Sequence, residues 1–143
     1  MAAIVLAHGA WSAAWAWKKM RPLIGAAGHE FFSPTCGNGW KLPINPMPPD
    51  TAPADVAWAS PRRRPQPIKT FEQKLRLESK AAPPPRHYIY AKRNGPGDVF
   101  RQFGERARSE AGWTYHEMDC SHNPHITCPE ALMAQLSDIM TGK

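Results

Sequence analysis

Apolar residues near the start of the chain follow the pattern of a strand, a helix and a second strand. The continuous apolar run at residues 2–7 predicts a strand buried on both faces. Apolar side chains then recur at helical spacing over residues 14–27, with Gly28 placed to end the helix. Pro22 inside this span predicts a kink or a break. Residues 30–33 predict the second strand, which completes one βαβ unit of about 33 residues.

The same alternation returns after residue 85. Strands are expected at residues 87–91 and 113–118, which are rich in β-forming residues. Between them, residues 98–110 predict a helix with Val99, Phe103 and Ala107 on one face. A last helix is expected from Thr127, with Glu130 completing a capping box. Its predicted buried residues are Ala131, Leu132, Leu136, Ile139 and Met140. The fold class is therefore α/β, with about four mostly parallel strands flanked by helices.

The middle of the chain lacks this periodicity. Eleven of the 16 prolines lie between Pro43 and Pro85, so a long strand or helix is excluded there. One short helix is predicted at residues 53–59, capped by Thr51, and a strand or loop edge at residues 71–77. We expect a single domain in three parts: residues 1–35, a proline-rich segment at 36–85, and residues 86–143.

Charge and composition limit the choice of partners and compartment. The net charge is +6, and its densest point is the triple arginine at residues 62–64. No RNA-binding motif or aromatic stacking platform accompanies these arginines, so we expect a solvated loop that binds neither nucleic acid nor a membrane. The three cysteines fit reduced thiols, and no secretory signal or apolar span is evident. These features favour a cytoplasmic protein.

Three stretches of sequence resemble a known family. They are IVLAHGAWSAAWAW at residues 4–17, YIY at residues 88–90 and CSHNPHITCPEAL at residues 120–132. Together they resemble the α/β-hydrolase fold, in particular the branch of methylesterases, salicylate esterases and hydroxynitrile lyases with their bacterial relatives. The segments at residues 45–50 and 65–67 resemble the end of the cap region in bacterial members. The resemblance implies a hydrolase acting on carboxylic esters or related small carbonyl compounds, without a cofactor.

The resemblance also implies roles for individual residues. The backbone N–H of Ala10 corresponds to half of an oxyanion hole, which stabilises charge in a tetrahedral intermediate. Lyase members have a threonine at the position of Gly9, so an esterase is favoured over a lyase. His122 corresponds to the general base, which accepts a proton and returns it to the leaving group.

The acid of the triad and its nucleophile both depart from the family pattern. Asn94 stands at the aligned position of the acid, Asp98 is the nearest replacement, and Asp119 is a second one. No Gly-x-Ser-x-Gly elbow surrounds any serine in the chain. The chain looks like an internally deleted hydrolase that lacks the elbow and roughly a hundred residues, with the join near Cys36 and residues 36–85 as a cap remnant. Little or no triad-dependent activity is expected.

Other interpretations remain open from the residues alone. One is a zinc site formed within thirteen positions by His116, Cys120, His122, His125 and Cys128. A second uses Ser12 or Cys120 as the nucleophile. A third is a non-enzymatic α/β domain whose unpaired strand edges lead to homo-oligomers. The prolines at residues 43–49 could also bind a partner as polyproline II.

Overall fold

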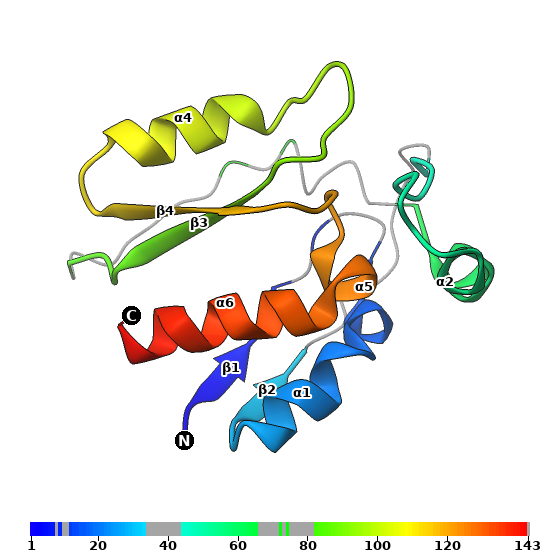
Figure 1. The fold of residues 1–143 in the computed structure, drawn as a ribbon, viewed down its shortest axis with the longest axis horizontal. Coiled ribbons are helices and arrows are strands. Elements are labelled where there is room, and N and C mark those ends of the chain that lie inside the picture. Colours follow the sequence, from blue (N-terminus) through cyan, green and yellow to red (C-terminus); the bar gives the residue numbers. More distant parts are fainter. Residues whose placement is uncertain are drawn as a thin grey trace.

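A computed structural model describes residues 1–7, 9, 12–33, 44–65, 72, 74 and 82–142 of the chain. Strands and helices alternate through the described residues in the order expected of an α/β protein (Figure 1). The first part holds strand β1 (Ala3–Val5), the 3₁₀ helix η1 (Ala14–Trp17), helix α1 (Met20–Ala26) and strand β2 (Glu30–Phe32). The middle holds helix α2 (Pro53–Ala59) and the 3₁₀ helix η2 (Ser60–Arg62). The last part holds β3 (Arg86–Ala91), α4 (Arg101–Ser109), β4 (Trp113–Met118), α5 (Pro124–Thr127) and α6 (Pro129–Thr141).

The described strands form two separate parallel sheets of two strands each. In one, β1 pairs with β2 from Ala3↔Glu30 to Val5↔Phe32. In the other, β3 pairs with β4 over six residue pairs, from Arg86↔Trp113 to Ala91↔Met118. The parallel pairing was predicted, but the expectation of one sheet of about four strands is corrected. Each pair comes from one strand–helix–strand unit, and no described strand joins the two pairs; helix α6 lies between them and contacts α1 (Figure 1).

The predicted N-terminal helix is broken, although not at its proline. Helix η1 ends at Trp17 and α1 begins at Met20, so the break falls before Pro22. Pro22 lies in the first turn of α1, where its missing N–H has no intrahelical partner to lose. Gly28 follows the helix with a φ of 77°, a left-handed conformation that glycine adopts without strain.

Two predicted helix caps are wrong. Helix α2 begins at Pro53 as predicted, but no side chain caps it, and the buried hydroxyl of Thr51 has no hydrogen-bond partner among the described residues. At the C-terminal end, Thr127 closes α5 and its hydroxyl donates to the carbonyl of Asn123 at 3.2 Å. Helix α6 then begins at Pro129, because the fixed φ of proline suits the first helical position.

The predicted apolar face of α4 is also wrong in part. Val99 is 61% exposed and Phe103 is 48% exposed, whereas Ala107 is buried as expected. The helix begins at Arg101 rather than at residue 98, so Val99 lies before its first turn. The second buried position of α4 is Gly104.

Gly104 allows α4 to lie close to the β3–β4 sheet. A Cβ atom at this position would lie 3.3 Å from the rings of both Tyr90 and Tyr115. This is tighter than most Cβ contacts, so a larger residue would push the helix away from the two rings. The absence of a side chain, rather than a long apolar side chain, therefore decides this packing.

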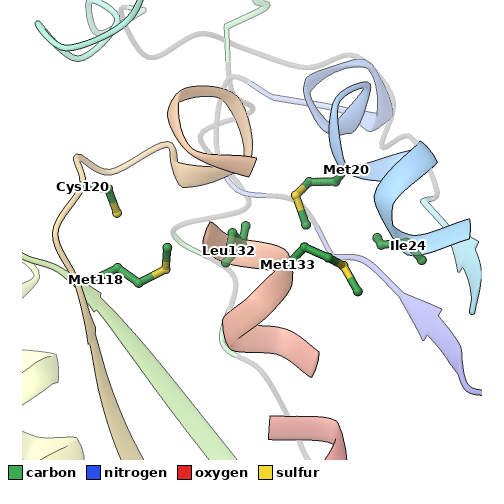
Figure 2. Packing of buried hydrophobic residues seen from close by; sticks show 6 residues of the cluster. All are labelled: Met20, Ile24, Met118, Cys120, Leu132 and Met133. Atoms are coloured by element: carbon green, nitrogen blue, oxygen red, sulfur yellow. The ribbon is translucent and has the colours of Figure 1, made fainter. Parts of the chain in front are cut away.

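One core joins both sheets through helices α1 and α6. Its buried residues are Met20 and Ile24 of α1, Met118 and Cys120 at the end of β4, and Leu132 and Met133 of α6 (Figure 2). Partly buried side chains from the strands surround them, among them Ile4, Phe31, Ile89 and Ala91. Among the residues expected to be buried in α6, Leu132 is buried and Leu136 and Ile139 are half-buried, whereas Ala131 and Met140 are exposed.

The described part of the proline-rich middle packs on the N-terminal helices. Lys19 forms an ion pair with Asp55 at 2.6 Å and donates a second hydrogen bond to the carbonyl of Ile126 at 2.9 Å. The ring of Trp15 meets that of Trp58 edge-on, with centroids 5.4 Å apart. Helix α2 is thereby held against η1 and α5.

The triple arginine at residues 62–64 is bonded to its own surroundings. Each guanidinium donates to a backbone carbonyl, at Trp58, Asn45 and Pro61 respectively.

The strand or loop edge expected at residues 71–77 lies largely outside the described residues, as does the join near Cys36. Within the described ranges, no helix is both long enough and apolar enough to cross a membrane.

Candidate functional site

A cavity of about 180 Å³ opens at the carboxyl ends of β3 and β4. Its described lining comes from the second half of β3 and the loop after it, from Phe100 before α4, and from the segment that follows β4. The lining is mostly apolar, and its polar members include Asn94 and His122. Ligand sites of parallel α/β sheets lie at this end of the strands, because the connecting loops converge there.

His122 lies in the loop after β4 and lines this cavity. Its ring stacks on Phe100, with centroids 4.2 Å apart and planes at 13°. Desolvation lowers the pKa of His122, and the negative charge of Asp98 acts in the opposite direction. The imidazole is therefore neutral at pH 7 and can accept a proton, as a general base must.

Asp98 lies beside the cavity in the loop between β3 and α4. Its carboxylate accepts a hydrogen bond from the hydroxyl of Tyr90 at 2.5 Å and another from the backbone N–H of Phe100 at 2.9 Å. The hydrogen bond from Tyr90 is the largest influence that lowers the pKa of Asp98. None of the hydrogen bonds among the described residues joins Asp98 to His122. Asp98 thus affects the histidine through its charge and through its bond to Phe100, on which the ring stacks.

The two other candidates for the acid position have hydrogen-bond partners of their own. The side-chain amide of Asn94 donates to the carbonyl of Ala91 at 2.6 Å. Both carboxylate oxygens of Asp119 accept from Arg93, at 2.9 and 2.7 Å. Asp98 is therefore the best placed of the three carboxylate or amide side chains, and its role as the acid remains a prediction.

His125, in the short helix α5 directly after the His122 loop, was not singled out by the motif as part of the site. Its ring stacks on Trp17, with centroids 4.8 Å apart and planes at 7°. Burial, and to a smaller extent the charge of His122, lowers the pKa of His125 to about 4. His125 thus stays neutral while it anchors the His122 loop to η1. The tryptophans near residue 15 were visible in the sequence, but nothing in the sequence indicated that one of them packs against His125.

The residues of the alternative zinc site lie in different places. His116 meets His87 across the β3–β4 sheet, His122 stacks on Phe100, and His125 stacks on Trp17. Cys120 lies near Cys128, and it lines the same cavity as His122, but these side chains do not form one cluster with the other histidines. Among the described residues, no group of three or more histidine, cysteine, aspartate or glutamate side chains could hold a metal ion.

The alternative nucleophiles do not suit the cavity. Cys120 lines it but is only 3% exposed, and burial together with the nearby Cys128 raises the pKa of its thiol to about 12. A protonated thiol is a poor nucleophile at neutral pH. Ser12 is not among the described residues that line the cavity. Ser121 precedes His122, but it is only 3% exposed, and its backbone N–H donates to Asp50 at 3.3 Å.

Ala10, expected to contribute the oxyanion-hole N–H, lies outside the described residues. Its role stays a prediction. The chain order of the other candidates agrees with an α/β-hydrolase, in which the acid follows one strand and the histidine follows a later one. Here Asp98 follows β3 and His122 follows β4.

Comparison with known proteins supports the fold through structure rather than sequence. No protein-family model matches the chain, and no curated protein matches it either. The structure is similar to the crystal structure of a methylesterase from Arabidopsis, with a TM-score of 0.75, 16% sequence identity and 100% coverage of both chains. The chain has an α/β-hydrolase-like fold. At this level of identity the similarity concerns the fold alone, and it confirms the α/β class expected from the sequence.

Proposed function

We propose that this protein is esterase-like and binds carboxylic esters or related small carbonyl compounds in the cavity at the ends of β3 and β4. The observation that carries the proposal is His122, a neutral imidazole at an apolar cavity in an α/β-hydrolase-like fold. Stacking on Phe100 limits the orientations of the ring, which favours proton transfer over a freely rotating surface histidine. The described lining of the cavity includes no serine.

The chemistry open to such a site is hydrolysis by water with His122 as the base. Water attacks the ester carbonyl while its proton passes to the imidazole, and the imidazole then returns the proton to the departing alcohol. The carboxylate of Asp98 favours the imidazolium that forms in between, since its charge raises the pKa of His122. Since no serine of the described lining can form an acyl-enzyme, this route is slow compared with that of a complete triad.

The narrower assignment is to the methylesterase-like branch, as a bacterial-type member with an internal deletion. The chain contains no Gly-x-Ser-x-Gly sequence. The described strands form two separate parallel pairs, which is the arrangement that loss of the strands between them would leave. The described part of the middle segment packs beside the His122 loop, as a cap remnant would, since Asp50 accepts from the N–H of Ser121.

Serine-directed labelling and ester hydrolysis test this function together. We expect a fluorophosphonate probe to label no serine, because no elbow activates one. Hydrolysis of p-nitrophenyl acetate should be slow and should fall by roughly a hundredfold in the variant His122→Gln, the usual contribution of a general base. The matched control is His29→Gln, which removes a histidine whose Nδ1 accepts from the N–H of Ala2, far from the cavity in the fold. Its rate should equal that of the wild type.

Two outcomes would contradict this function. Stoichiometric labelling of a single serine would show that a working nucleophile exists. An equal rate in wild type and His122→Gln would mean that any turnover is nonspecific. Nuclear magnetic resonance with a non-hydrolysable ketone would then report separately whether the cavity binds carbonyl compounds.

A second candidate function is self-association without catalysis. Val5 and Phe32 are partners in the register of the β1–β2 sheet, and they are 72% and 51% exposed. Exposed apolar residues on a short sheet favour contact with a second copy of the chain.

Light scattering after size-exclusion chromatography tests this second candidate. The wild type should elute with at least twice the monomer mass at high concentration, and Val5→Glu should shift it towards the monomer because a charge would be buried in the contact. The control is Val99→Glu, at a residue that is similarly exposed but lies beside α4. A wild type that stays monomeric at every concentration would rule out the association.

A further inference from the structure

Two histidines meet on neighbouring strands, away from the cavity. His87 of β3 and His116 of β4 lie diagonally across the parallel pair, since His87 is in register with Thr114 and His116 with Ile89. The Nδ1 atom of His87 is 3.0 Å from the Nε2 atom of His116, and the rings are stacked at 21°. His87 is exposed and His116 is half-buried. Neither residue lines the described wall of the His122 cavity.

A third side chain orients this pair. The side-chain amide of Gln135, on α6, lies 3.2 Å from the Nδ1 atom of His116. The nitrogen and oxygen of a glutamine amide can exchange places by a flip, so the amide oxygen can equally face the ring. In that orientation the Nδ1–H of His116 donates to Gln135, and the lone pair on Nε2 faces His87 and accepts from its Nδ1–H. A metal ion can take the place of that proton when His87 carries its proton on Nε2 instead. This is the arrangement by which outer partners fix metal-binding histidines.

We propose that His87 and His116 form a binding site for a divalent transition metal ion, ligated by Nδ1 of His87 and Nε2 of His116. Imidazole nitrogens are the ligands that Zn²⁺, Cu²⁺ and Ni²⁺ share. Two nitrogens bound to one tetrahedral ion at 2.0–2.1 Å lie about 3.3 Å apart. The pair at 3.0 Å needs to open by only a few tenths of an ångström, with a rotation of the exposed His87 ring.

The number and type of the ligands predict how the metal ion is held. Two protein ligands leave the remaining positions to water, so the ion exchanges readily, in contrast to a closed structural zinc site. A bound ion would also link β3 to β4. The order of affinity should place Cu²⁺ above both Ni²⁺ and Zn²⁺, because the ligands are both imidazoles.

Calorimetric titration of the full chain, prepared without a histidine tag, tests the site with CuCl₂ and ZnCl₂. We expect one ion per chain, with Cu²⁺ bound more tightly. His87→Ala and His116→Ala should each weaken binding at least tenfold, and Gln135→Leu should weaken it about tenfold because an outer partner is lost. His122→Ala is the control, since it removes a different exposed histidine, and it should bind metal as the wild type does.

Electron paramagnetic resonance of the Cu²⁺ form keeps the test decisive if a variant folds poorly. Hyperfine structure from two nitrogens is expected in the wild type, and from one in His87→Ala, whose exposed side chain is not needed for the core. Absence of saturable binding, or binding that survives both His87→Ala and His116→Ala, would overturn the proposal. Loss of binding in His122→Ala alone would also overturn it, because the ion would then belong to the cavity.

Discussion

Replacement of Met20 by alanine should lower the free energy of unfolding by about 3 kcal/mol, within the range for substitutions that leave a cavity in place of a buried methionine. Met20 is fully buried in the core cluster that joins α1 to α6. Each described sheet has only two strands, and no described strand joins the two sheets. The contact between α1 and α6 therefore connects the β1–β2 sheet to the β3–β4 sheet. A cavity there removes contacts that neither sheet alone can replace.

Urea denaturation followed by circular dichroism measures the effect. Met140→Ala is the matched control. Met140 belongs to α6, one of the two helices in contact, but it is 38% exposed. It should cost less than about 1 kcal/mol. If the two variants lose the same stability, α1 and α6 do not share the core described above.

Acidification should destabilise the protein between about pH 6.5 and pH 4 through His125. Burial and the charge of His122 lower the pKa of His125 to about 4, whereas the unfolded chain has the ordinary value near 6.5. The stabilising contribution is complete above the unfolded pKa and is lost as the pH falls towards the folded pKa. A difference of about 2.5 units corresponds to about 3 kcal/mol over this window.

Urea denaturation at several pH values tests this window. His125→Phe keeps an aromatic ring against Trp17 and removes this titration, so its loss of stability between pH 6.5 and 4 should be clearly smaller than that of the wild type. The loss that remains comes in part from His122, whose pKa is also lowered by desolvation. His29→Gln should retain the wild-type profile. Two carboxylates act at lower pH. Hydrogen bonds from Tyr90 and Arg93 lower the pKa values of Asp98 and Asp119 respectively, so their contributions to stability are lost only as the pH falls below the ordinary pKa of an aspartate. A wild type that is equally stable at pH 6.5 and pH 4.5 would contradict the role of His125.

Local pattern predicted the elements whose ends are set by neighbouring residues. Strand β4 and helix α2 have the predicted bounds, since β-forming residues and a proline at the first helical position act over a few residues. The predicted helix caps at Thr51 and Thr127 are wrong. Pro129 rather than Thr127 sets the start of α6, and the hydroxyl of Thr51 is buried with no partner in the part of the chain that the structure describes.

The candidate site also has a part that the sequence indicated and a part that only the structure shows. The family resemblance singled out His122, and the structure places it at a cavity; its role as a base remains a prediction. The stacking of His125 on Trp17 could not be read from the sequence, because 108 positions separate the two residues. The approach of His87 to His116 depends on the register of two strands, since a shift by one residue would turn one ring to the other face.

The sequence by itself determined the α/β class, the parallel strand pairs and the histidine loop after β4, because periodicity and turn residues act locally. Only the tertiary structure decided that the described strands form two sheets, that α1 and α6 join them, and that Gly104 lets α4 lie on two tyrosine rings. It also decided the low pKa of His125. These features depend on side chains brought together from distant parts of the chain, whose packing and desolvation no local pattern records.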